Sequence, residues 1–245
     1  MDVKEKIEKA KEIHSLLFKS PKLNLSLKID DTINNAPFFK TITINFYKEM
    51  TKRHKKLPLF GQMTRGVAIC PLNGDYESYI KGIESSGHRN VKKANRIGYT
   101  FQRINFNDHL DEIWDIRKST TVRQGKLSDD FINNKPDKIT DPESNSLVHG
   151  FPYFGVFDEN HVLVAYAGCF LAGDVIELSH FYGHAEHQKN GVVPLLITSI
   201  AKVAIEEHPT VKFFMYGGLI GASTSLKRFK KKFNFLPHHV KWSLK

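Results

Sequence analysis

The last hundred residues hold the pattern that most limits the fold. Residues 151–184 contain three runs typical of strands, separated by turn residues at 158–160 and 173–174. The patterns that follow predict a helix, a strand, a helix and a strand over 192–207, 211–218, 223–233 and 238–245. Hairpins followed by this alternation predict a mixed α/β fold, with a central sheet and helices on its faces. A ligand is then expected where strand ends meet helix starts.

The rest of the chain is expected to extend this sheet. Apolar spacing predicts a helix over 2–19 and another that begins near His109, while Asn73 or Asp75 is expected to cap a third. Strands are expected over 23–29, 41–47, 66–72 and 99–105. We expect one domain over residues 1–245. Within it, residues 1–65 form an N-terminal helix/strand extension and the polar, turn-rich residues 123–150 form a long surface loop.

Composition narrows the class of protein. The 245 residues are 40% hydrophobic and include 18 phenylalanines, enough for a sizeable core. No run of eighteen apolar residues occurs, so no membrane span is expected, and the charged start lacks the apolar centre of a signal peptide. Cys70 and Cys169 both lie in apolar runs, which favours reduced core residues in a cytoplasmic protein.

The positive charge is concentrated in the first part of the chain. Residues 1–98 carry 19 Lys and Arg against 10 Asp and Glu, whereas the rest of the chain is nearly balanced. Such an asymmetry suits an anionic partner: a phosphate-bearing small molecule, a membrane surface, or a nucleic acid. Solvated lysines alone account for much of it, so the partner stays open.

The start of the predicted helix at 192 carries a candidate anion site. Gln188, Lys189, Asn190 and Gly191 lead into it, and Pro194 suits a first helical turn because it has no N–H to satisfy. The unpaired N–H groups of a helix N-terminus attract anionic oxygen, and a glycine allows close approach of the backbone. An ordinary strand-to-helix loop with nothing bound explains the same residues.

These residues resemble a known signature. Gln188-Lys189-Asn190-Gly191-Val192-Val193 is similar to the Gln/Arg-x-x-Gly-x-Gly/Ala motif of GNAT acyltransferases, although Val193 stands where the family has Gly or Ala. The resemblance implies a GNAT fold, whose central mixed sheet is mostly antiparallel and flanked by helices. It implies acyl-coenzyme A, such as acetyl-coenzyme A, as co-substrate, its pyrophosphate at the helix start. We expect Phe181, Tyr182 and Gly183, in the preceding strand, to contact this donor as well.

A second resemblance covers roughly residues 66–240. "GHRNVKKANRIGYTF" and "FFMYGGLIGASTSLKRFKKKFNF" are similar to passages of Fem-type proteins, the GNAT-fold transferases that build peptidoglycan bridges. Those enzymes have two such domains and a donor carried by transfer RNA. The length here suits one domain, which favours an acyl-coenzyme A donor, with aminoacyl-transfer RNA as the alternative. Arg123 and Gln124 lie in a segment resembling Fem-like proteins, where they are expected on the acceptor side; alternatively, Arg123 holds the loop to the body of the domain.

Acyl transfer to an amine needs a base, and two residues qualify. Alternation along 174–188 places Glu177, Ser179 and Phe181 on one strand face and His180 on the other. Glu177 lies eleven positions before Gln188, close to where several GNAT enzymes carry their base, and burial would raise its pKa toward neutrality. His180 titrates near the working pH. Each residue also has an explanation without catalysis. Glu177 could face solvent or pair with an arginine, and His180 could be a hydrogen-bonded packing residue.

The leaving group needs an acid, and here the sequence departs from the GNAT pattern. Phe229 stands where GNAT enzymes often carry a tyrosine, as it does in Fem-type proteins. Tyr216, Tyr182 or Lys230 is expected to substitute, and Lys230 matches the Fem-type lysine, which implies stabilisation of negative charge. Alternatively, Lys230 belongs to a solvated basic face.

No metal site is expected. His180 and His184 lie about 13 Å apart on an extended strand, too far for one zinc ion with bonds of roughly 2 Å. The chain is therefore expected to be an N-acyltransferase that acylates a small-molecule amine, an amino sugar or an amino acid. The rival from another class is a catalytically inactive GNAT-fold protein that binds a polyanion. Acceptor, acyl chain length and oligomeric state stay open.

Overall fold

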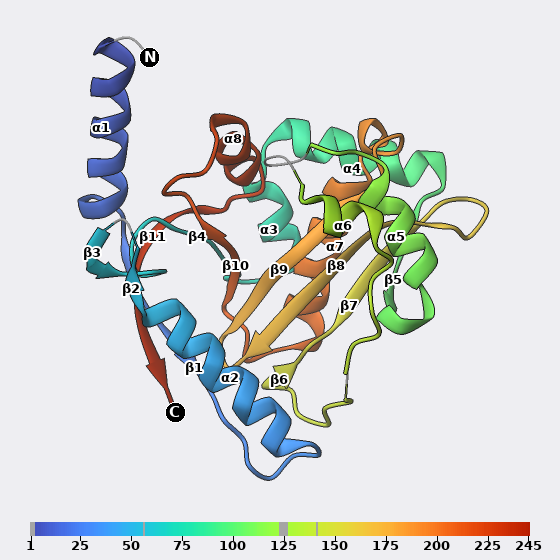
Figure 1. Ribbon diagram of the computed structural model, residues 1–245, viewed down its shortest axis with the longest axis horizontal. Coiled ribbons are helices and arrows are strands. Elements are labelled where there is room, and N and C mark those ends of the chain that lie inside the picture. The colour runs from blue at the N-terminus through green and yellow to red at the C-terminus, as the bar shows by residue number, and fades with distance from the viewer. Residues whose placement is uncertain (1–2, 56, 123–126, 141) are drawn as a thin grey trace.

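The computed structural model describes residues 3–55, 57–122, 127–140 and 142–245, which form one curved sheet with helices on both faces (Figure 1). Nine strands of the described chain belong to this sheet, and β6 (His149–Gly150) pairs at the side of β8. The remaining strands follow the spatial order β1 (Lys22–Leu27), β11 (Leu236–Leu244), β4 (Val67–Pro71), β10 (Phe213–Gly218), β9 (Val175–Gly183), β8 (Leu163–Ala172), β7 (Tyr153–Phe157), β5 (Thr100–Ile104). The pairs β1–β11 and β9–β10 are parallel and the others are antiparallel.

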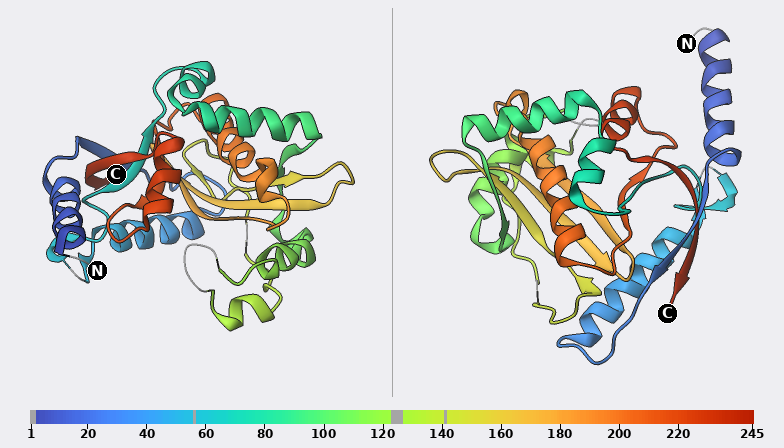
Figure 2. Two further views of the ribbon diagram at one scale, coloured as in Figure 1. Left: turned by 90° about the horizontal axis from the view of Figure 1, so that it is seen from above. Right: turned by 180° about the vertical axis from the view of Figure 1, so that it is seen from behind.

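The helices divide between the two faces of the sheet (Figure 2). One face packs against α3 (Tyr76–Gly82), α4 (Ser85–Ile97) and α7 (Val192–Glu207), which bury the largest apolar cluster. The opposite face packs against α2 (Ala36–Thr51) and α5 (Leu110–Lys118), and α6 (Asp129–Asn133) lies beside α5. Three further elements complete the description: α1 (Val3–Phe18), which projects from the body, the hairpin of β2 (Arg53–His54) and β3 (Leu57–Gly61), and α8 (Thr224–Lys232) after β10.

The C-terminal half matches the pattern of its sequence closely. The predicted helix over 192–207 has those bounds, and the expected strands and second helix lie within two residues of their predicted limits. Gly173 forms the turn between β8 and β9 at φ 62°, where a Cβ would lie 2.3 Å from the Ser26 carbonyl oxygen. Glycine is required there because both the positive φ and the close backbone exclude a side chain. Asp75 caps α3, its carboxylate accepting from the amide of Ser78 at 2.7 Å.

The strand predicted over 41–47 is wrong, because these residues lie inside α2. The run "TITINFY" alternates like a strand, and its β-branched residues favour one locally. Over residues 36–51, however, Phe39, Ile42, Phe46 and Met50 recur at helical spacing. Phe39 is buried, and the other three pack into the apolar cluster between α2 and the sheet. Pro37 lies in the first turn of α2 and is a signal for a helix start, but it lies outside the run 41–47 from which the strand was predicted.

The region expected to be a long loop contains structure. Residues 123–150 include α6, whose N-cap Ser128 accepts from the Phe131 amide, and the short strand β6. The N-terminal segment is likewise joined to the sheet, since β1 pairs along its whole length with β11. Within the described residues, no helix combines the length and the apolar composition that a bilayer crossing needs.

Candidate functional site

The sheet opens at the junction of β9 and β10. These parallel strands pair only where Phe213–Met215 lie beside Val175–Glu177. Beyond that point β9 continues to Gly183 and β10 to Gly218 without pairing to each other. A cavity of about 700 Å³ occupies the gap. The divergence thus creates a binding space at the carboxyl ends of two parallel strands, next to the start of α7.

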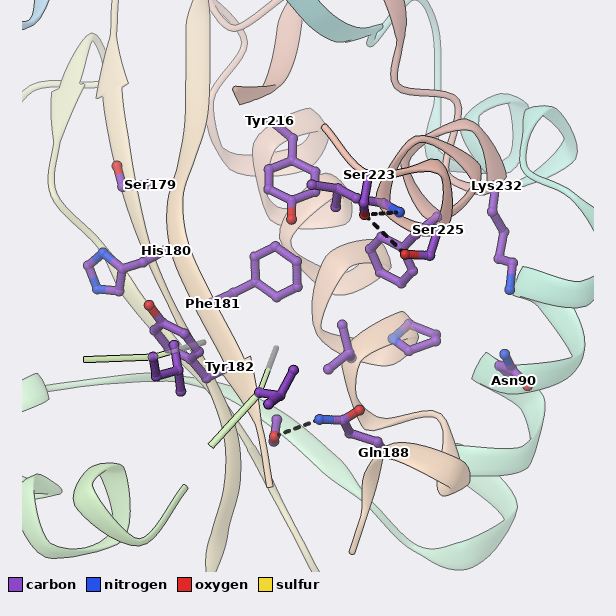
Figure 3. Close-up of a pocket in the computed structure, with 17 residues that line it drawn as sticks. Asn90, Ser179, His180, Phe181, Tyr182, Gln188, Tyr216, Ser223, Ser225 and Lys232 are labelled. Carbon is purple, nitrogen blue, oxygen red and sulfur yellow. Dashed lines mark hydrogen bonds between the residues drawn. The ribbon is translucent and has the colours of Figure 1, made fainter. Parts of the chain in front are cut away.

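The cavity is lined from both faces of β9, as the close-up shows (Figure 3). Phe181 and Tyr216 pack edge to face with ring centroids 5.1 Å apart, and Phe229 of α8 extends this aromatic wall. His180 and Tyr182 project on the other side of the strand. The rest of the lining comes from five parts of the chain. The start of α7 supplies Gln188, Val193 and Pro194, and α8 with its cap supplies Ser223, Ser225, Leu226 and Lys232. α4 supplies Asn90, the connection between α5 and α6 supplies Val122 and Leu127, and β9 supplies Ser179 and Gly183.

A β-bulge changes which side chains share a face of β9. The register with β8 shifts at Ser179, because Cys169 pairs with Leu178 while Gly168 pairs with His180. The extra residue reverses the alternation beyond it. The prediction that Glu177, Ser179 and Phe181 share a face is therefore wrong. Phe181 packs with Leu178 on the α7 side, whereas Glu177 and His180 lie opposite residues of β8 that share the other face.

Glu177 lies where the two strands part, and it reaches the cavity through Ser179. The Ser179 hydroxyl donates to the Glu177 carboxylate at 2.5 Å, and Ser179 lines the cavity. Burial raises the pKa of Glu177 to about 7, although this hydrogen bond and the charge of Lys230 oppose the rise. A carboxylate with this pKa is present in both protonation states near neutrality, which is the property required of a general base.

Lys230 is a buried cation on α8 whose ammonium group reaches the end of β10. Its side chain is only 3% exposed, so it is not part of a solvated basic face. The ammonium donates to the Gly218 carbonyl at 2.8 Å and lies 4.2 Å from the centre of the Tyr216 ring. Burial lowers its pKa to about 8, against the opposing influence of Glu177. The two charges therefore act on each other across the junction of the strands.

His180 is a poorer base than Glu177. Its imidazole packs among the rings of Tyr153, Tyr166 and Tyr182. Burial, and secondarily the charge of Arg117, lower its pKa to about 4. The ring is therefore neutral at working pH, and it suits hydrogen bonding or packing against an acceptor better than proton abstraction. In the described part of the chain, no group of three His, Cys, Asp or Glu side chains is arranged to hold a metal ion.

The residues before α7 form a short 3₁₀ helix, η2 (Gln188–Asn190), that is fastened to α4 and β9. The side-chain Nε2 of Gln188 donates to the Gly183 carbonyl oxygen at 3.2 Å, and the side-chain Nδ2 of Asn190 donates to the Tyr99 hydroxyl at 3.1 Å. The Lys93 ammonium donates to the Lys189 carbonyl at 2.9 Å. These contacts hold the start of α7 in place, and they account for Asn190 as a structural residue.

Gly191 is required by packing as well as by backbone conformation. Its φ is 88°, and a Cβ would lie 2.3 Å from the Asn90 carbonyl oxygen of α4. Val192, next to it, is fully buried in the α7 core. Val193 lines the cavity, and its Cγ2 would lie 2.7 Å from a Cβ added at Gly183. The valine in place of the usual small residue thus packs over a glycine, and its side chain occupies space beside the helix start.

Of the predicted site residues, seven line the cavity: His180, Phe181, Tyr182, Gly183, Gln188, Val193 and Tyr216. Glu177, Lys230, Lys189, Asn190, Gly191 and Val192 surround it without lining it, and Arg123 and Gln124 lie outside the described residues. Sequence reasoning missed Asn90, Ser223, Ser225 and Lys232, which come from α4 and α8. Their approach depends on tertiary packing, for which the sequence carries no local signal.

The comparisons with known proteins concern the fold. No protein-family model matches the sequence, and a search of curated proteins finds no match. Among solved structures, FemX aligns with a TM-score of 0.52 and 13% identity over 69% of this chain and 58% of FemX. L-PGS from Bacillus licheniformis aligns less well, with a TM-score of 0.45 and 15% identity over 69% of this chain and 56% of that one.

The aligned region thus covers less than two thirds of the FemX chain and less than two thirds of the L-PGS chain. At 13% identity, the likeness to FemX is a likeness of fold. It confirms the predicted fold class, a GNAT-like fold in which a central mixed, mostly antiparallel sheet is flanked by helices.

Proposed function

We propose that this protein is an N-acyltransferase that joins an acyl group to a small-molecule amine in the opening between β9 and β10. The observation that carries the proposal is this opening: two parallel strands part beside a helix start, and a carboxylate and a buried ammonium lie at the junction. A donor and an acceptor can approach from opposite faces of the sheet, because residues of both faces of β9 line the cavity.

Acyl-coenzyme A, with acetyl-coenzyme A as the simplest case, is the proposed donor. The N-terminus of α7 offers main-chain N–H groups and a partial positive charge to a pyrophosphate. Lys232 lines the same cavity and adds a full charge. The aromatic wall of Phe181, Tyr216 and Phe229 supplies an apolar surface for the pantetheine chain and the acyl group.

The chemistry requires proton transfer from the amine and to the leaving thiolate. Glu177, directly or through the Ser179 hydroxyl, accepts the proton of the acceptor ammonium. The freed amine attacks the thioester carbonyl carbon, and the negative charge that develops on its oxygen lies in the field of Lys230. The C–S bond breaks, the thiolate takes a proton from Tyr216 or Lys230, and the attacking nitrogen gives its second proton back to that residue, which leaves a neutral amide. Because Glu177 must be deprotonated, the transfer rate is expected to rise with pH through about 7.

The donor is tested by calorimetry with acetyl-coenzyme A, before any acceptor is known. Lys232→Glu is expected to weaken binding at least tenfold, whereas Lys81→Glu, on the exposed surface of α3, makes the same charge change away from the cavity. A panel of amines then tests transfer, and Glu177→Gln is expected to abolish transfer while leaving donor affinity unchanged. A folded protein that binds no acyl-coenzyme A overturns this donor.

A second donor, an aminoacyl-transfer RNA, is favoured by the charges around the cavity. α4 carries four Lys or Arg residues, and α8 carries five, of which Lys231 and Lys232 are neither buried nor ion-paired in the described residues; neither helix contains an Asp or Glu. Val193 also fills space beside the start of α7 where a pyrophosphate would approach. Affinity that falls steeply with salt marks polyanion binding. Aminoacyl transfer in addition would identify this donor, and binding without any transfer would identify a catalytically inactive polyanion-binding protein.

A further inference from the structure

A second cavity, of about 460 Å³, lies at the other end of the sheet. Its walls come from the edge strand β1, from β11 and from the β2–β3 hairpin, which lies at the foot of α1 (Figure 1). In the order of the sheet, β4 separates β11 from β10 and hence from the candidate active site. This second cavity is therefore independent of the acyltransferase proposal.

Positively charged side chains gather in this second cavity. Lys22, Arg65 and Lys241 line it together with His239, and no Asp or Glu is among its lining residues. Lys22 pairs with His239 across β1 and β11, and Asn24 pairs with Lys241, so these side chains leave the same face of the sheet. Across the described residues, no carboxylate forms an ion pair with Lys22, Arg65 or Lys241. Like charges held together in this way favour an added anion.

One nitrogen of Arg65 is already hydrogen-bonded, which leaves the Nε and Nη2 groups of the guanidinium to donate to such an anion. Its Nη1 donates to the Leu17 carbonyl oxygen at 3.0 Å and to Nδ1 of His239 at 2.5 Å. Burial, together with the charges of Arg65 and Lys22, lowers the pKa of His239. A neutral imidazole that accepts at Nδ1 carries its proton on Nε2, so this ring also offers a donor. Guanidinium, ammonium and imidazole donors together match a phosphate group, which accepts through several oxygens.

Apolar side chains border the charged ones. Phe60 lies beneath the Arg65 guanidinium, 5.1 Å from ring centre to Cζ, and Trp242 lines the cavity on the β11 side. Leu59, also in the lining, is 92% exposed at the hairpin, and Phe18, 58% exposed, lies 6.0 Å from Phe60 between ring centres. Exposed large apolar residues next to a charged pocket indicate a ligand with both characters.

We propose that this cavity binds a phosphate group carried on an apolar chain, with Arg65, Lys22 and Lys241 around the phosphate and Leu59 and Phe60 against the chain. The same chemistry occurs in a soluble alkyl phosphate and in the head group of an anionic phospholipid, so the test includes both sources.

Trp242 provides an indirect reporter of binding, because it borders the cavity while it is only 7% exposed and its indole packs against Phe46 of α2. The chain has two tryptophans, and Trp114→Phe leaves Trp242, which lines the cavity, as the remaining one. Titration of this single-tryptophan protein with octyl phosphate is expected to give a saturable change in emission. Inorganic phosphate is expected to bind more weakly, because it lacks the chain, and octyl glucoside, which has the chain without the charge, is expected to give no response.

Charge-matched variants separate a built site from general attraction. Lys22→Gln/Lys241→Gln removes two exposed lysines of the cavity and is expected to weaken octyl phosphate binding about tenfold. Lys81→Gln/Lys202→Gln makes the same change of net charge on α3 and α7, and its affinity is expected to stay within twofold of the parent. Equal weakening in both double variants, or no response to any phosphate ligand, overturns the proposal.

Vesicles identify the source of the phosphate. A Trp242 response to vesicles that contain phosphatidylglycerol, and none to vesicles of phosphatidylcholine alone, identifies an anionic head group in a bilayer. A response to octyl phosphate without a response to either kind of vesicle identifies a soluble ligand. An equal response to both kinds of vesicle shows that charge is not recognised, and the proposal fails.

Discussion

The substitution Gly191→Ala tests whether the start of α7 is held in place by α4. At φ 88° an alanine is in the left-handed region, which costs about 1–2 kcal/mol of folding free energy. Its Cβ would also lie 2.3 Å from the Asn90 carbonyl oxygen, so α4 and η2 must move apart, at a further cost of about 1–3 kcal/mol. Alanine recovers a few tenths of a kcal/mol by restricting the unfolded chain. The net loss is about 3 kcal/mol, or roughly 6–12 °C in Tm for a protein of this size.

Gly221→Ala is the matched control for Gly191→Ala. Gly221 has a similar φ of 81°, but no atom lies within 4 Å of the position of a Cβ. It therefore carries the conformational cost without the collision, about 1 kcal/mol. Thermal unfolding of both variants, followed by circular dichroism, measures the difference. Equal losses would refute the close approach of α4, and a large loss in Gly191→Ala alone would show that substitutions there report stability as well as ligand binding.

Two further outcomes follow from the site. The folded pKa of Glu177, about 7 against an ordinary 4.5, means that the folded state binds more protons between these values, so up to about 3 kcal/mol of stability is lost as pH rises from 4.5 to 7. Denaturant unfolding of Glu177→Gln should lack this loss, and an unchanged slope with pH would contradict the burial of the carboxylate. Gly183→Ala places a Cβ 2.7 Å from the Val193 side chain and should destabilise by about 1–3 kcal/mol. Adding Val193→Ala should restore most of this loss, and two additive losses would exclude the contact.

The C-terminal half of the fold could be predicted from the sequence, whereas part of the N-terminal half could not. α7 and the strands around it were predictable because long apolar periods and glycine turns agree locally with the final structure. The strand expected over 41–47 failed because β-branched alternation competes with a helical period, and packing against the sheet decided for the helix. Local preference was overridden by tertiary contacts.

The candidate site was predictable in its strand and helix start but not in its side-chain directions. One bulged residue, Ser179, exchanges the faces of β9, and no period in the sequence reveals such an insertion. The burial of Lys230 was equally hidden, because "KRFKKK" has the composition of a solvated helix surface. Its burial depends on how the helix α8 turns toward β10, which is a tertiary property.

The pairing of β1 with β11 sets an order on assembly. Lys22 lies beside His239, so this contact closes a loop of more than two hundred residues. Such long-range closure is slow, because its entropic cost precedes the reward of the contacts. β1, and the α2 residues that pack against β11, cannot reach their final environment until the last strand of the sheet is available. The basic N-terminal segment is therefore expected to dock last, and the second cavity, between β1, β11 and the hairpin, is then completed only at that final step.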